Sequence, residues 1–178
     1  MTSLQANDFE LFGLPERFAQ ERSDIDARWK DLQRQTHPDK FATQGAAAQR
    51  VAMQWSVRVN EAYQRLKDPL KRAAYLCELR GAPIRAEDNT AMPATFLMQQ
   101  MQWRESLDES SDAAELDALQ DEVQQARQDL LQKCQQLLDV SGQPAEAAQQ
   151  VRALMFIERF ASDIENRYEQ MELAGGRP

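Results

Sequence analysis

The single histidine of the chain, His37, stands directly before Pro38 and Asp39. An imidazole and a carboxylate separated by one residue could act together in acid–base catalysis or help to bind a metal ion. The sequence contains no glycine-rich phosphate loop, no nucleophile elbow and no second histidine to support either chemistry. The tripeptide could also be a plain turn, because proline and aspartate both favour turns.

The two cysteines, Cys77 and Cys134, are far apart in the sequence and form no CxxC pair, the spacing typical of zinc and redox motifs. We interpret both as reduced, small apolar residues carried by helices of a cytoplasmic protein. The sequence therefore predicts no enzyme activity, no catalytic residue, no bound metal ion and no cofactor.

The tripeptide follows a predicted helix that opens at Ser23. The apolar residues of this helix recur at spacings of four, three and four, which places them on one face. They are Ile25, Trp29, Leu32 and Thr36. Lys30 and Arg34 point to the opposite side, and Arg28 flanks the apolar face. The helix must stop there, because Pro38 disfavours the helical conformation of the residue before it.

Three further helices complete the first half. A short helix over the sequence FELFGL, capped by Asn7 and Asp8, precedes the helix described above. A long helix over about residues 46–66 follows the tripeptide. An Asp-Pro pair then starts a fourth helix, which ends at Gly81. The second and third helices can pack antiparallel, with His-Pro-Asp at the joint between them.

The second half reads as a separate helical unit. Its first residues show no periodicity and are interpreted as a linker. Three helices follow, at about residues 93–109, 112–139 and 144–172, and their short connections make them antiparallel neighbours. The predicted fold class is therefore all-α, with a four-helix domain over residues 1–81, a linker over 82–92 and a three-helix bundle over 93–178.

The net charge of −8 is distributed unevenly. Residues 1–80 carry 13 Lys and Arg against 11 Asp and Glu, a net of +2, whereas residues 81–178 carry 8 against 18, a net of −10. This balance argues against broad nucleic-acid binding, and the basic surplus of the first half suits an acidic protein face. Because no apolar run is long enough to span a bilayer and the N-terminal residues lack a secretory signal pattern, we expect a cytoplasmic protein.

The first bundle helix carries more apolar residues than one buried face needs. At 100° per residue, Phe96, Trp103 and Leu107 share a narrow arc, and three further residues lie on an adjoining arc. These three are Leu97, Met98 and Met101. In the last helix, Phe156 similarly lies beside the core-facing stripe. Methionine and phenylalanine together can form an adaptable partner-binding surface, although periodicity alone leaves burial equally open.

Four motifs of the first half, in order, resemble the J domain of chaperone partners. They are FELFGL, HPDK at the end of a basic helix, VNEAYQRLKDP and KRAAY. The resemblance implies that the loop docks on an ATPase of the heat-shock chaperone class and triggers ATP hydrolysis. The implied contacts are His37, Pro38 and Asp39, flanked by Arg28, Lys30, Arg34 and Lys40.

Three longer stretches, LQRQTHPDKFA, DPLKRAAYLCELRG and FLMQQM, are similar to the HscB family of J-domain co-chaperones of bacterial iron–sulfur cluster biogenesis. This resemblance implies two partners, an HscA-like ATPase chaperone and an IscU-like iron–sulfur scaffold protein. The implied scaffold-binding residues are Leu97, Met98, Met101 and, in LMFIERF, Phe156. Met101 stands where a larger aliphatic residue is common in the family.

The resulting hypothesis is a monomeric adaptor that promotes iron–sulfur cluster assembly or transfer. One alternative is a general J-domain co-chaperone that acts in protein folding on unfolded clients. A direct carrier of iron or of a cluster is a second alternative, although two distant cysteines and one histidine would make a poor site unless chains dimerise.

Overall fold

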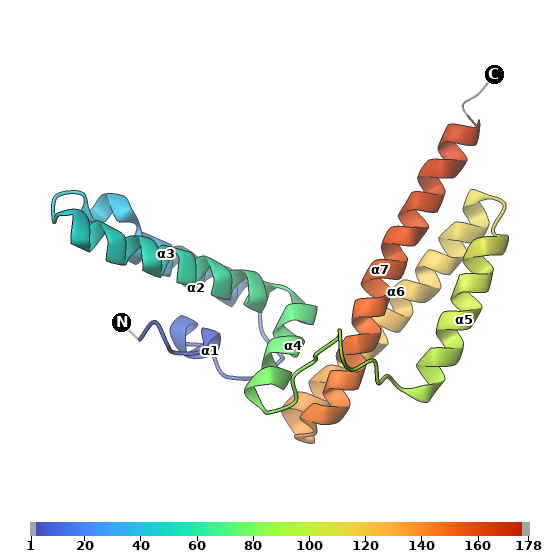
Figure 1. Cartoon of the computed structure of the whole chain (residues 1–178), viewed down its shortest axis with the longest axis horizontal. Coiled ribbons are helices and arrows are strands. Elements are labelled where there is room, and N and C mark those ends of the chain that lie inside the picture. Colours follow the sequence, from blue (N-terminus) through green and yellow to red (C-terminus); the bar gives the residue numbers. More distant parts are fainter. Residues whose placement is uncertain (1–2, 176–178) are drawn as a thin grey trace. The chain divides into compact units, whose positions relative to one another are not determined.

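The computed structural model describes residues 3–175, and every regular element in that range is helical (Figure 1). This all-α structure agrees with the predicted fold class. The elements are α1 (Asp8–Phe12), α2 (Arg22–Thr36), a 3-10 turn η1 (Pro38–Phe41), α3 (Ala46–Lys67), α4 (Pro69–Leu79), α5 (Ala94–Glu109), α6 (Ala113–Gln135), a π turn η2 (Gln136–Val140) and α7 (Pro144–Gly175).

The chain divides into two compact units, residues 1–76 and 77–178. The division falls inside α4, five residues before the domain end that we placed at residue 81 from the pattern. Residues 82–92 are non-helical and lie within the second unit. There Arg152, a buried residue of α7, donates hydrogen bonds to the carbonyl oxygens of Ile84 and Ala91, at 3.0 and 3.1 Å. This contact ties the segment to the bundle.

The short helix α1 is capped at both of its ends and is held against α3 by ion pairs. Asn7 caps it by accepting a hydrogen bond from the Glu10 N–H, and Gly13 ends it in the left-handed conformation. Asp8, which we expected to share the capping role, is fully buried instead. Its carboxylate forms ion pairs at 2.7 Å with Arg58 and Arg65 of α3. A buried carboxylate needs such partners, so these pairs fix α1 against α3.

The helices α2 and α3 pack side by side in opposite directions (Figure 1). α2 begins at Arg22, one residue before the predicted start. Glu21 is its N-cap residue, and the Glu21 side chain forms no capping hydrogen bond. The Trp29 ring stacks on Tyr63 with centroids 4.3 Å apart, and its indole N–H donates to Asn60. These contacts leave Trp29 half-buried.

Fewer side chains are fully buried between α2 and α3 than the sequence pattern indicated. Ile25 and Thr36 of α2 are buried, as predicted, together with Val59, Tyr63 and Leu66 of α3. Trp29 and Leu32, which were expected on the same face as Ile25, are only partly buried, as is Trp55 of α3. Val51 of α3 is exposed. The two long helices are accompanied by only one short helix, α1. The apolar face of each long helix therefore has fewer neighbours to bury it than it would have in a three-helix bundle.

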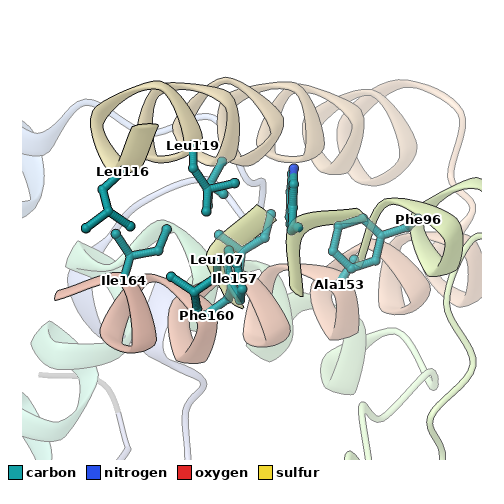
Figure 2. Packing of buried hydrophobic residues seen from close by; sticks show 10 residues of the cluster. Phe96, Leu107, Leu116, Leu119, Ala153, Ile157, Phe160 and Ile164 are labelled. Carbon is teal, nitrogen blue, oxygen red and sulfur yellow. The ribbon is translucent and has the colours of Figure 1, made fainter. Parts of the chain in front are cut away.

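The second unit is a bundle of α5, α6 and α7 around a continuous apolar core (Figure 2). Phe96 and Leu107 of α5 meet Leu116 and Leu119 of α6 and the α7 residues of the core (Figure 2). The α7 members are Ala153, Ile157, Phe160 and Ile164. The predicted helix over residues 112–139 is regular only to Gln135, after which a π turn carries Leu137 and Leu138 into buried positions.

Within residues 3–175, no helix combines the length and the apolar composition that a bilayer crossing requires.

Candidate functional site

The His-Pro-Asp tripeptide forms a sharp corner between α2 and η1. His37 is the C-cap of α2 in an extended conformation, and Pro38 begins the 3-10 turn. The Asp39 N–H donates a hydrogen bond of 3.2 Å to His37 Nδ1, and an Asp39 carboxylate oxygen lies 3.6 Å from the same nitrogen. Because Nδ1 accepts a hydrogen bond, the neutral imidazole carries its proton on Nε2.

Both polar side chains of this corner face solvent, with 59% of the His37 side chain and 93% of the Asp39 side chain exposed. Neither side chain is enclosed by the surrounding protein, so both are accessible from solvent. A proline-fixed turn with an exposed imidazole and carboxylate is suited to contact with another macromolecule.

An open groove of about 740 Å³ runs along α2 to this corner. Its lining residues are Lys30, Gln33, Arg34, His37, Asp39 and Lys40. Three of these residues are cations, namely Lys30, Arg34 and Lys40. Lys30, Arg34 and the corner lie on the same side of α2, because they are separated by one or two helical turns. Arg34 also pairs with Asp31, which holds its guanidinium at the groove.

The structure brings five of the seven residues predicted for chaperone contact into this groove. Pro38 shapes the corner but does not line it. Arg28 lies elsewhere, with its guanidinium against Gly13 at the end of α1. The helical pattern had already placed Arg28 beside the apolar face, apart from Lys30 and Arg34, and only the resemblance to the J domain grouped it with them.

A second surface lies on α5, in the other unit. The exposed fractions of Leu97, Met98 and Met101 are 48%, 68% and 74%. Phe96 and Trp103 on the same helix are buried in the bundle core, so α5 carries apolar side chains on two different faces. No charged residue occurs between Ala94 and Trp103. We call Leu97, Met98 and Met101 the α5 patch.

Phe156 of α7 is partly buried and packs against the bundle core. Its ring stacks on Phe160 with centroids 5.8 Å apart and meets the edge of Phe96 at the same distance. Through Phe96, which directly precedes Leu97 on α5, the ring contacts the helix that carries the α5 patch.

Sequence reasoning missed Arg104, which belongs to the same region. Its guanidinium lies over the rings of Phe156 and Phe160, 5.8 and 5.2 Å from their centroids, and it pairs with Asp163 at 2.7 Å. The signal that could have found it is its position seven residues after Leu97, which places both on one helical face.

The two cysteines are free thiols and both are buried. Burial raises the pKa of Cys77 to about 11 and that of Cys134 to about 12, so both are protonated at neutral pH. Across residues 3–175, no group of three or more His, Cys, Asp or Glu side chains is placed to hold a metal ion.

Comparisons with known proteins agree with this architecture. Residues 92–165 match the family described as the HSCB C-terminal oligomerisation domain. The chain is 51% identical to a co-chaperone protein HscB homolog of Burkholderia thailandensis and 49% identical to that of Burkholderia multivorans. Each alignment covers 97% of this chain and 99% of the relative.

Two solved structures are also similar. Chaperone HscB from Vibrio cholerae superimposes with a TM-score of 0.84 at 37% identity, over 93% of this chain and 99% of that one. The human co-chaperone protein HscB superimposes with a TM-score of 0.85 over 94% of this chain and 84% of that one. At 23% identity, the human structure supports the fold alone.

The fold and the exposed corner define a J-domain protein, in which an N-terminal J domain is followed by a C-terminal helical bundle. The sequence relatives narrow this class further. The chain belongs to the HscB family of co-chaperones.

Proposed function

We propose that this co-chaperone binds an IscU-like iron–sulfur scaffold protein, delivers it to an HscA-like ATPase chaperone and stimulates ATP hydrolysis by that chaperone. The observation that carries the proposal is the presence of two exposed surfaces of different chemistry on separate units of one chain. One is the charged groove with His37 and Asp39, and the other is the uncharged α5 patch.

The groove is assigned to the chaperone. His37, Pro38 and Asp39 form the contact proper, and Lys30, Arg34 and Lys40 surround it as cations. A cationic rim attracts an acidic partner face over several ångströms and orients it before contact. Arg28 lies outside the groove and contributes only to this long-range attraction.

The scaffold is assigned to the α5 patch together with Phe156. Leu97, Met98 and Met101 expose apolar area that a partner can remove from water, at roughly 25 cal/mol per Å². The flexible thioethers of the two methionines can adjust to the shape of the partner. Iron–sulfur cluster assembly or transfer is then promoted by bringing the scaffold to the chaperone.

A single adaptor that holds both partners raises the effective concentration of the scaffold at the chaperone. In this proposal the chain supplies no catalytic group, metal ion or cofactor, and works in the cytoplasm as a monomer. It contacts neither nucleic acid nor membrane, and its working domains are those predicted at residues 1–81 and 93–178. The description of the matched family as an oligomerisation domain makes sedimentation of the free protein a direct check of the monomer.

The test is the ATPase rate of the HscA-like chaperone alone, with this protein, with the scaffold, and with both. We expect the rate with both to exceed the product of the two separate stimulations. Stimulation that is indifferent to the scaffold, and equal with unfolded clients, would identify a general J-domain co-chaperone instead. Absence of stimulation under every condition would contradict the assignment of the groove.

A further inference from the structure

We infer that Arg104 is a positioning residue of the scaffold-binding surface, because it holds the half-buried ring of Phe156 in a fixed orientation beside the α5 patch. The inference rests on the proposed function. It concerns the first charged residue after the uncharged run at residues 94–103, a position that apolar periodicity does not mark.

Arg104 occupies a border position on α5. At 100° per residue, Arg104 lies about 20° from Leu97 and about 60° from Met101 around the helix axis. Phe96, which faces the core, lies about 80° to the other side of Arg104. Arg104 therefore stands at the border between the buried face of α5 and the exposed patch, where the ring of Phe156 also lies.

The Phe156 ring is in contact with three other side chains. Phe160 stacks against it with an interplanar angle of 14°, Phe96 meets it at 80°, and the Arg104 guanidinium lies over it. Asp163, one turn further along α7 from Phe160, holds the guanidinium at 2.7 Å. A planar cation over two stacked rings restrains both, and the anion on α7 restrains the cation.

The ion pair between Arg104 and Asp163 affects folding and binding differently. The Arg104 and Asp163 side chains are 50% and 39% exposed, and an ion pair with that exposure contributes little to folding stability. The effect on binding is different. A partner that meets an already ordered ring does not have to order it on association, so the arrangement improves affinity by preorganisation.

The experiment is a double-mutant cycle, read out as the dissociation constant of the full-length protein for the IscU-like scaffold. Arg104→Ala is measured in the natural background and in Phe156→Ala. The loss of one partly exposed cation–π contact predicts binding about two- to five-fold weaker in the natural background. In the Phe156→Ala background we expect less than about a 1.5-fold change, because the residue through which Arg104 acts is gone.

Three controls separate positioning from other effects. Arg104→Lys keeps a cation over the ring and the partner of Asp163, so it should recover most of the affinity. Arg127→Ala removes the same charge from α6 and should leave scaffold affinity unchanged. Stimulation of the chaperone without scaffold should be the same in all variants, and their thermal unfolding shows whether the bundle remains folded.

Equal weakening in both backgrounds would overturn the inference, since it would mean that Arg104 acts independently of Phe156. An unchanged affinity in the natural background would also overturn it. Leu97→Ala with Met101→Ala distinguishes this failure from failure of the proposed function. If that variant loses scaffold binding while Arg104→Ala does not, only the role of Arg104 is wrong. If the natural protein does not bind the scaffold, both are wrong.

Discussion

The groove along α2 and the α5 patch present opposite kinds of surface. The groove gathers three cations and one carboxylate around a proline-fixed corner, whereas the α5 patch consists of three aliphatic side chains in a run of ten uncharged residues. The groove is suited to long-range attraction and to directional contacts. The patch is suited to the burial of apolar area, which is short-ranged and tolerant of shape.

This difference separates the two proposed tasks physically. A transient encounter with an ATPase benefits from rapid, electrostatically steered association. Retention of a folded scaffold benefits from apolar burial, which mainly slows dissociation. The units that carry the surfaces also differ in net charge, +2 over residues 1–80 and −10 over residues 81–178, so an acidic partner face would be attracted to the first unit and not to the bundle.

The largest expected effect comes from Asp39→Asn. Removal of one member of a charged contact that is buried on binding costs about 2–5 kcal/mol, or roughly thirty-fold and more in affinity. We therefore expect stimulation of the chaperone ATPase to fall to the basal rate, while the scaffold dissociation constant stays unchanged. Asp24→Asn, at an exposed acid in the first turn of α2, is the matched control and should stimulate normally.

An equal loss of scaffold binding in the Asp39→Asn protein would break the comparison, because it would mean that the two surfaces do not act separately. Circular dichroism of the variant checks that the J domain remains helical.

The second-largest expected effect is a loss of scaffold affinity with stimulation of the chaperone retained. Leu97→Ala together with Met101→Ala removes exposed apolar carbons that a partner would bury, worth about 1.5–3 kcal/mol in total. Scaffold affinity should fall by about tenfold to a hundredfold, measured by calorimetry, and scaffold-independent stimulation of the chaperone should persist. Leu173→Ala removes a leucine near the end of α7 that is more exposed than Leu97, and it should change neither quantity.

Sequence periodicity predicted the buried face of α5 for a physical reason. The bundle closes around one face of this helix, and the 100° rule places Phe96 and Trp103 on it. The rule left the exposure of Met98 open, and the structure shows that this side chain is exposed. In the J domain the same rule was less successful. It identified the inward face of α2, but it could not give the depth of burial of Trp29 or Leu32, since that depends on how few neighbours cover α2 and α3.

The residues that escaped prediction act through long-range contacts. Arg104 and Asp163 are 59 positions apart, and Arg152 reaches back 68 positions to the carbonyl oxygen of Ile84. No local pattern encodes such pairs. Asp8 was expected to be a cap because of its place before a helix, and only the tertiary structure brings Arg58 and Arg65 to its carboxylate.

Salt provides a third test, with a smaller effect. Because screening weakens attraction between charged faces, the association rate with the chaperone should fall by about tenfold between low and high ionic strength. The scaffold association rate should change far less, since residues 94–103 are uncharged. Stopped-flow or biosensor measurements over a salt series would give both slopes. Parallel slopes would show that charge dominates both contacts.

The smallest expected effect distinguishes two arginines of α2. Arg34 lines the groove, whereas Arg28 lies against Gly13 outside it. Loss of one cation from the rim of an interface changes the association rate modestly, so Arg34→Ala should slow association with the chaperone by about two- to three-fold. Arg28→Ala removes the same charge further from the contact and should slow it less. If Arg28→Ala has the larger effect, the chaperone face extends beyond the groove toward α1, and the charged surface is broader than the corner defined by His37 and Asp39.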